Sequence, residues 1–234
     1  MDFDHKKQGS DNEMKPYSQI PAAAYVILLS LQVPLNISFL LISANGLASG
    51  KLPISGEGLF FIYIGAAVFY FLVLGILGIT NIVRSFLAYG RGNEEHCLRG
   101  MLILKYGMVP FFIINFCSIL LLSLAALVGS RGTLLFAFPV TVPLLFLAFF
   151  CTWLAMVPGS FYSIQVIRLT RKKGKTNLLW AVWHGFLQFC FLTDVLDTMY
   201  LAVRKWNRGK LGAALIGLLY IGAAGWVILT VCAS

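Results

Sequence analysis

Residues 59–83 read LFFIYIGAAVFYFLVLGILGITNIV, an apolar run with no charged side chain and no proline. About 20 apolar residues in an α-helix are enough to cross roughly 30 Å of hydrocarbon. In lipid, the backbone of such a segment must satisfy its own hydrogen bonds, and a helix does so. The run therefore predicts a helix that crosses a membrane.

Similar apolar runs lie on both sides of this segment. The chain is 59% hydrophobic and only 12% charged, with a mean hydropathy of +0.84, so it has too little polar material to cover a soluble globule of its length. Lipid must therefore solvate most of the surface. We predict an all-α integral membrane protein, a helical bundle of five transmembrane spans over residues 22–44, 59–83, 102–128, 134–167 and 211–233.

The chain divides into a short polar segment and a long apolar one. Residues 1–21 mix acidic, basic and polar side chains and cannot bury enough apolar surface to fold alone, so we expect a disordered cytoplasmic tail. Residues 22–234 form the helical transmembrane domain. Within it, the run over 134–167 carries Pro139, Pro143 and Pro158, and we expect it to break or kink near its ends.

Residues 177–203 are long enough to cross the membrane, but they also contain charged side chains. If they cross, the basic cluster over 204–210 lies outside the cell. If they lie along the interface or dip in and return, that cluster stays inside and only Lys51 and Arg131 lie outside, a cleaner positive-inside pattern. We therefore predict a cytoplasmic-side amphipathic or re-entrant helical segment here and a cytoplasmic amino terminus, with six spans as the alternative.

The same charge count assigns the basic residues between the second and third runs to the cytoplasmic side. These residues are Arg84, Arg91, Arg99 and Lys105.

Polar side chains of the 177–203 segment fall within about half of a helical wheel, which indicates an amphipathic helix or helix pair. They form an interfacial polar site made of His184, Gln188, Asp194 and Asp197. An aspartate near mid-membrane costs about 2.5 to 3.5 kcal/mol, whereas at the headgroup level it costs little. We expect these carboxylates to pair with Arg204, Lys205 or the basic run over 171–175.

A second group of polar residues lies near the centre of apolar runs. Gln32 and Asn36 flank Pro34 in the first run, and Asn115 follows Pro110 in the third. Proline-interrupted helices with polar groups at similar depth are typical of a transporter site, because a broken hydrogen-bond ladder frees carbonyls for a ligand. The alternative is that these amides simply bond a neighbouring helix. On the transporter interpretation, Gln32, Asn36 and Asn115 form an intramembrane polar site.

Enzyme motifs fit the sequence poorly. Asp194 and Asp197 resemble the opening of the CDP-alcohol phosphotransferase motif, but Thr198 stands where that motif has glycine, and no acidic residue follows. No HExxH motif occurs, and neither a zinc ligand set nor a GxSxG serine is present. We therefore expect no metal and no cofactor, and a non-enzymatic role is favoured over a lipid-modifying enzyme that would use the two aspartates.

Two stretches, LKYGMVPFF over 104–112 and LQFCFLTDVLD over 187–197, are similar to segments of an uncharacterised family of small bacterial multi-span membrane proteins. The resemblance covers most of the chain and implies a bacterial plasma membrane. Because that family has no assigned activity, it assigns no role to any residue.

Two kinds of partner are expected. Anionic lipid headgroups fit the basic run at the end of the fourth span, which holds Arg168, Arg171, Lys172, Lys173 and Lys175. The second partner is another helix, because small residues in the last span allow its close approach; they are Ala213, Gly217, Gly222 and Gly225. The net charge of +9 is placed beside apolar spans, which favours lipid over nucleic acid.

Three functional hypotheses follow. The first is a non-enzymatic accessory or structural membrane component, and the second is a small transporter or substrate-binding membrane subunit with its site near Gln32, Asn36 and Asn115. The third is the lipid-modifying enzyme. A transport role needs a cavity that reaches mid-membrane, an enzyme needs convergent carboxylates, and an accessory role needs neither.

Overall fold

The structure, a computed structural model, describes residues 18–50, 55–129 and 138–233, so most of the predicted tail, Lys51, Arg131 and Leu134 lie outside it. Within these ranges the chain forms helices and no strand, which confirms the all-helical prediction. The helices are α1 (Ile20–Ala48), α2 (Gly56–Gly90), α3 (Glu94–Gly107), α4 (Val109–Gly129), α5 (Phe138–Lys172), α6 (Leu178–Leu187), α7 (Thr193–Tyr200), the π-helical turn η2 (Leu201–Lys205) and α8 (Lys210–Ala233).

Polar side chains fix where several helices begin. The side chain of Ser55 accepts a hydrogen bond from the Gly58 amide at 3.2 Å, and Asn93 caps α3 in the same way through the His96 amide at 2.9 Å. The side chain of Asn177 accepts from the Trp180 amide at 2.9 Å. These caps satisfy backbone donors that the first turn of a helix leaves without partners.

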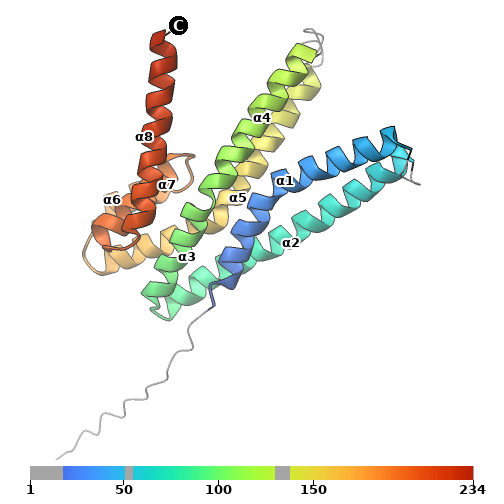
Figure 1. Cartoon of the computed structure of the whole chain (residues 1–234). Coiled ribbons are helices and arrows are strands. Elements are labelled where there is room, and N and C mark those ends of the chain that lie inside the picture. Colours follow the sequence, from blue (N-terminus) through green and yellow to red (C-terminus); the bar gives the residue numbers. More distant parts are fainter. Residues whose placement is uncertain (1–17, 51–54, 130–137, 234) are drawn as a thin grey trace, which may run out of the picture.

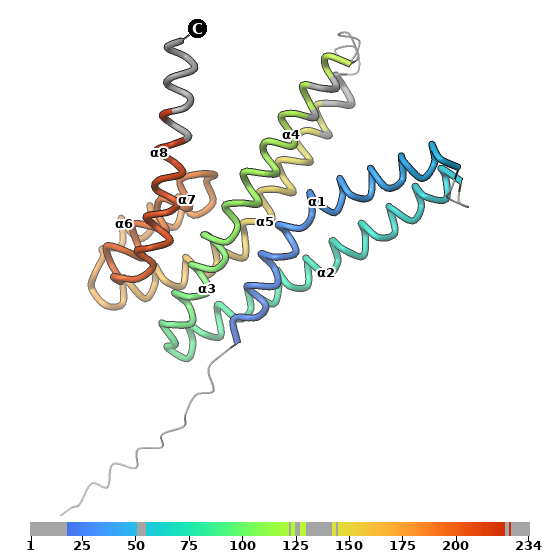
Figure 2. The backbone as a smooth tube through the Cα atoms, in the orientation of Figure 1, coloured from blue at the N-terminus to red at the C-terminus, as the bar shows by residue number. Residues whose placement is uncertain are grey.

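The helices form a fork (Figure 1). One arm holds α1 and α2, the other holds α4 and α5, and the two arms splay apart toward their tips. The start of α1, the end of α2, helix α3 and the end of α5 gather at the base, together with α6, α7 and the start of α8. The tube in Figure 2 follows this course, with α8 rising separately from the base.

The core lies at the base of the fork, around α3. The buried face of α3 carries Cys97, Met101 and Leu104, spaced three to four residues apart as one helix face requires, and Met108 follows at the end of the helix. Gly100 brings α5 close, because a Cβ at this position would stand 2.4 Å from the ring of Tyr162. Toward the tips the helices instead expose large apolar side chains to their surroundings.

Four helical segments are long and apolar enough to cross a membrane within the part of the chain that the structure describes. They are Ile20–Ala48, Gly56–Gly90, Glu94–Leu121 and Leu145–Lys172. Their outward faces carry residues such as Leu40, Phe61 and Phe69, which are 67 to 71% exposed and fit a lipid environment. Lys210–Gly222, at the start of α8, is a shorter apolar helical segment.

Two of the predicted runs differ from the helices in the structure. The third begins earlier, at Glu94, and is interrupted at Met108, because Pro110 has no N–H to donate to the carbonyl one turn earlier. The fourth run is predicted to break or kink near its ends; within the described residues α5 has no break and continues through Pro143 and Pro158. Near Pro158 the hydroxyl of Tyr25 donates to the carbonyl of Ala155 at 3.0 Å, which joins α1 to α5 at this point.

The 177–203 segment forms a helix pair. Helix α6 has 10 residues and α7 has 8, and they are separated by turns that end at Leu192, which has a positive φ of 69°. At 1.5 Å per residue, α6 reaches only about 15 Å, roughly half the thickness of the hydrocarbon layer. Neither helix alone is long enough to cross a membrane.

Candidate functional site

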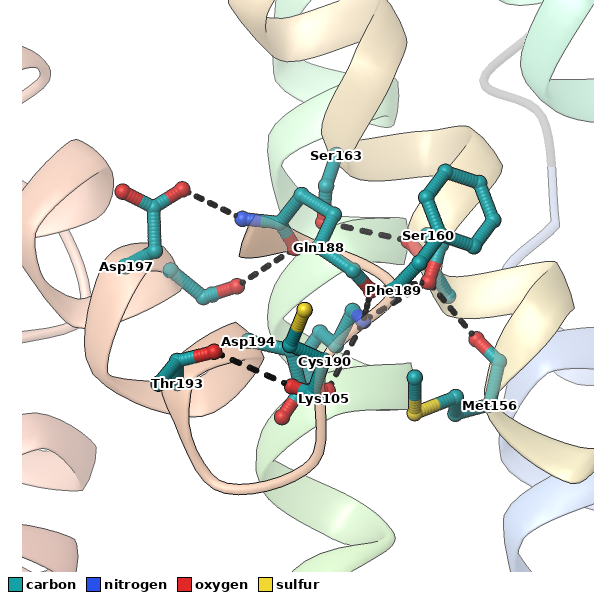
Figure 3. A network of polar contacts seen from close by, with 12 residues as sticks. Lys105, Met156, Ser160, Ser163, Gln188, Phe189, Cys190, Thr193, Asp194 and Asp197 are labelled. Atoms are coloured by element: carbon teal, nitrogen blue, oxygen red, sulfur yellow. Dashed lines mark hydrogen bonds and ion pairs between the residues drawn. The ribbon is translucent and has the colours of Figure 1, made fainter. Parts of the chain in front are cut away.

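Lys105 lies at the centre of a buried polar network (Figure 3). Its ammonium group donates hydrogen bonds to the carboxylate of Asp194 at 2.9 Å, the hydroxyl of Ser160 at 3.0 Å and the carbonyl of Gln188 at 3.1 Å. A lysine has three N–H donors, so all of them are used. These acceptors come from α5, the turn after α6, and α7, and Lys105 therefore joins three parts of the chain to α3.

The neighbours of Lys105 make room for its long side chain and complete its hydrogen bonds. A Cβ on Gly159 would stand 3.3 Å from the Lys105 side chain, so glycine at this position lets α5 approach the lysine. Ser160 also donates to the Gln188 carbonyl at 2.6 Å, which gives that oxygen two donors. The buried polar groups here are thus well satisfied, as a low-dielectric interior requires.

Asp197 extends the network away from Lys105. One carboxylate oxygen accepts from the amide of Gln188 at 2.6 Å, and the other bonds the Nδ1 atom of His184. The hydroxyl of Thr198 donates to the side-chain oxygen of Gln188 at 3.3 Å. Burial raises the pKa of Asp197 above its ordinary value, although His184, Gln188 and Lys105 partly offset this effect.

The structure brings together all four residues of the predicted interfacial polar site. Gln188 links its members, because its side chain bonds Asp197 and its carbonyl bonds the lysine that pairs with Asp194. The predicted partners of the carboxylates are wrong: Asp194 pairs with Lys105 and Asp197 with His184, instead of the basic residues over 171–175 or 204–205.

Lys105 differs from the prediction for it. The charge pattern predicts a cytoplasmic residue that sets topology, whereas its side chain is fully buried. The sequence feature that indicates burial is the position of Lys105 in MLILKYGMVPFF, where one lysine interrupts an apolar helix. A charge in such a place usually faces the interior of a bundle and has a partner there.

The residues of the predicted intramembrane site lie in different surroundings. Gln32 and Asn115 line one cavity of about 650 Å³, which we call the crevice. Asn36 is exposed, accepts a hydrogen bond from the hydroxyl of Tyr63 at 3.1 Å, and lines an adjoining hollow with Gln32. The structure therefore places two of the three residues at one cavity and the third beside it.

The crevice lies between the two arms of the fork. Its walls include Leu74 and Gly75 from α2, Phe111 from α4 and Ala155 from α5, together with residues of α1. Most of the lining is apolar. Asn115 donates to the hydroxyl of Thr152 at 2.9 Å, whereas the half-buried amide of Gln32 has no hydrogen-bond partner among the described residues.

The carboxylates do not form a metal centre in the described part of the chain. No group of three or more histidine, cysteine, aspartate or glutamate side chains that could hold a metal ion is found there. Asp194 and Asp197 are each bonded to a different basic side chain. The third functional hypothesis, which needs these carboxylates to share a metal, therefore gains no support from the geometry.

The architecture is that of an all-helical protein with several helices long and apolar enough to cross a membrane. A model of the family of unknown function DUF6652 matches residues 24–208, and the chain belongs to this family. The resemblance to an uncharacterised family is thus confirmed, and both the Lys105 network and the crevice residues lie within the matched range. No curated protein and no solved structure matches the chain.

Proposed function

We propose that the chain is an integral membrane protein with five spans, formed by α1, α2, the α3–α4 segment, α5 and α8. The gathering of helix ends at the base of the fork supports this topology, because the basic residues over 168–175 and 204–210 then share one side (Figure 1). The helix pair α6–α7 lies at that side without crossing. We assign the side to the cytoplasm, together with the amino terminus, and the membrane to the bacterial plasma membrane that the family resemblance implies.

We infer further that the protein is a non-enzymatic, substrate-binding membrane subunit that holds a single-chain amphiphile in the crevice. The observation that carries this proposal is the crevice itself, about 650 Å³ of mostly apolar space that Gln32 and Asn115 line. An accessory role needs no such cavity. The volume is within the usual range of ligand sites, roughly 300 to 1,000 Å³.

Gln32 indicates which end of such a ligand would bind where. An amide without a partner is costly in hydrocarbon, and a ligand with a hydroxyl, ester or amide group would supply the missing hydrogen bond. The apolar walls from the two arms would accommodate an acyl chain. This combination favours an amphiphile over an ion, because no charged side chain lines the crevice.

The test compares Gln32→Leu with Asn36→Leu, a matched control one turn further along α1 whose side chain lies outside the crevice. Monoolein serves as the probe, titrated into the detergent-purified full chain, with bound species counted by native mass spectrometry. We expect Gln32→Leu to raise the dissociation constant of monoolein about fivefold. This factor corresponds to the loss of one hydrogen bond of about 1 kcal/mol. Equal binding by both variants and the wild type would contradict the assigned role of Gln32.

A helix partner for α8 is a second proposal, in line with the accessory hypothesis. Ala213 is buried, and a Cβ on Gly217 would stand 3.7 Å from Met199, so both positions face the rest of this chain. A Cβ on Gly222 or Gly225 would meet nothing within 4 Å. The outer half of α8 therefore has space for the close approach of another helix, which crosslinking between cysteines placed at Gly222 would detect.

A further inference from the structure

A second hollow lies along α6, next to the His184–Asp197 end of the Lys105 network. It has a volume of about 690 Å³ and shares no lining residue with the crevice. Lys175 and Lys205 stand in its wall, together with Trp180 and Trp183, and His184 and Asp197 belong to its floor. The hollow thus combines two ammonium groups with exposed aromatic rings.

The two lysines are held next to each other by reciprocal hydrogen bonds. Lys175 donates to the backbone carbonyl of Lys205 at 2.8 Å, and Lys205 donates to the carbonyl of Lys175 at 2.9 Å. Each ammonium group has three donors, and these bonds use one on each side. Two like charges are thereby fixed close together with N–H donors to spare.

No carboxylate in the described part of the chain forms an ion pair with either lysine. The nearby Lys173 differs, because Glu94 pairs with it at 2.5 Å. Asp197 lines the hollow, but its oxygens are bonded by His184 and Gln188. The charge of Lys175 and Lys205 therefore remains available to an anion.

We propose that this hollow binds a phosphate group, with the ammonium groups of Lys175 and Lys205 as its ligands. Charge-assisted hydrogen bonds from two fixed donors are the contacts that a phosphate oxygen cluster accepts best. This site goes beyond the crevice and does not depend on the crevice having a ligand.

The aromatic residues point to a phosphate carried by a lipid. Trp180 is 56% exposed and Trp183 is 52% exposed, and Phe186 beside them is 61% exposed. Tryptophan is enriched at the headgroup level of membranes, where its ring contacts the acyl boundary and its N–H stays near water. An anionic phospholipid and soluble phosphate share the chemistry that the lysines recognise, and the experiment separates the two sources.

The test uses the full chain in detergent with three probes: phosphatidylglycerol, phosphatidylcholine and inorganic phosphate. Thermal unfolding is followed as each probe is added. The variant Lys175→Gln/Lys205→Gln is compared with Arg91→Gln/Arg99→Gln, which removes the same charge from exposed residues outside the hollow. We expect the first variant to bind phosphatidylglycerol at least about tenfold more weakly, and the control to bind like the wild type.

Stabilisation by phosphatidylglycerol that depends on the two lysines, with little effect of inorganic phosphate, supports a lipid headgroup. An equal, lysine-dependent effect of inorganic phosphate supports the phosphate site with a soluble ligand. If both double variants bind phosphatidylglycerol equally, the proposal is overturned. If the double variant unfolds, the single variants Lys175→Gln and Lys205→Gln are tested in its place. Gln32→Leu, which changes the crevice, is expected to leave binding of phosphatidylglycerol unchanged.

Discussion

Lys105 and Asp194 are 89 positions apart in the chain, yet their side chains form an ion pair of 2.9 Å in which neither is more than 3% exposed. Removing one member of such a pair leaves the other charge buried without compensation, whereas replacing both with apolar groups is often tolerated. The pair joins α3 to α7, and it therefore contributes to the attachment of the α6–α7 helix pair to the rest of the molecule.

The first prediction concerns this attachment. We expect Lys105→Met to lower the free energy of unfolding by about 3 to 5 kcal/mol, because Asp194 stays buried without its cation. The double variant Lys105→Met/Asp194→Leu should recover part of the loss. Unfolding of the detergent-solubilised protein measures both. A double variant that is less stable than the single one would show that the two residues act independently.

The exposed pair of Arg99 and Glu95 provides the control for this experiment. Their side chains are 65% and 58% exposed and lie one helical turn apart, at 2.7 Å. Exposed pairs of this kind contribute about 0 to 1 kcal/mol. We expect Arg99→Ala to change stability by no more than that, so a large loss in Lys105→Met reflects burial and not the loss of a positive charge.

The second prediction concerns the pH dependence of stability. Burial raises the pKa of Asp197 above 3.8 in the folded state, so this carboxyl favours folding below 3.8 and loses that contribution as pH rises through its raised value. Relative to Asp197→Asn, the wild type should therefore lose stability as pH rises above about 4. Melting temperatures of the two proteins test this. If the wild type instead gains stability relative to Asp197→Asn as pH rises, the pKa of Asp197 is lowered, and His184, Gln188 and Lys105 outweigh the effect of burial on it.

The third prediction concerns topology. In a cysteine-free background, a cysteine at Ser49 should react with an impermeant thiol reagent in intact cells, because the tip of the α1–α2 arm lies outside in the five-span arrangement. A cysteine at Asn207, between η2 and α8, should stay unlabelled until the membrane is opened. Labelling of Asn207 from outside would favour six spans.

The long helices and the members of the α6–α7 polar group could be predicted from the sequence, because apolar length and helical spacing are local properties. The partners of Asp194 and Asp197 could not be predicted in this way. Nearby lysines and arginines are close in sequence, but the choice of Lys105 depends on how α3 packs against α5 and α7. The crevice escaped prediction for the same reason, since it exists only where two helix pairs diverge.

Pro158 illustrates a further limit of sequence patterns. Its missing N–H leaves the carbonyl of Leu154 without a helical donor and predicts a break or kink, but α5 continues through it. Whether a proline ends a membrane helix therefore depends on the packing around it, which only the tertiary fold supplies.

The proposed function rests on occupancy of the crevice, and filling the crevice tests it most directly. Gly75 lines the crevice and Gly65 lies earlier on the same helix outside it, and a Cβ at either position would meet nothing within 4 Å. Gly75→Phe and Gly65→Phe therefore make the same change in two different places. The measurement is the number of monoolein molecules that each purified variant retains, counted by native mass spectrometry. We predict retention by the wild type and Gly65→Phe and its loss in Gly75→Phe; equal retention by all three would contradict the account.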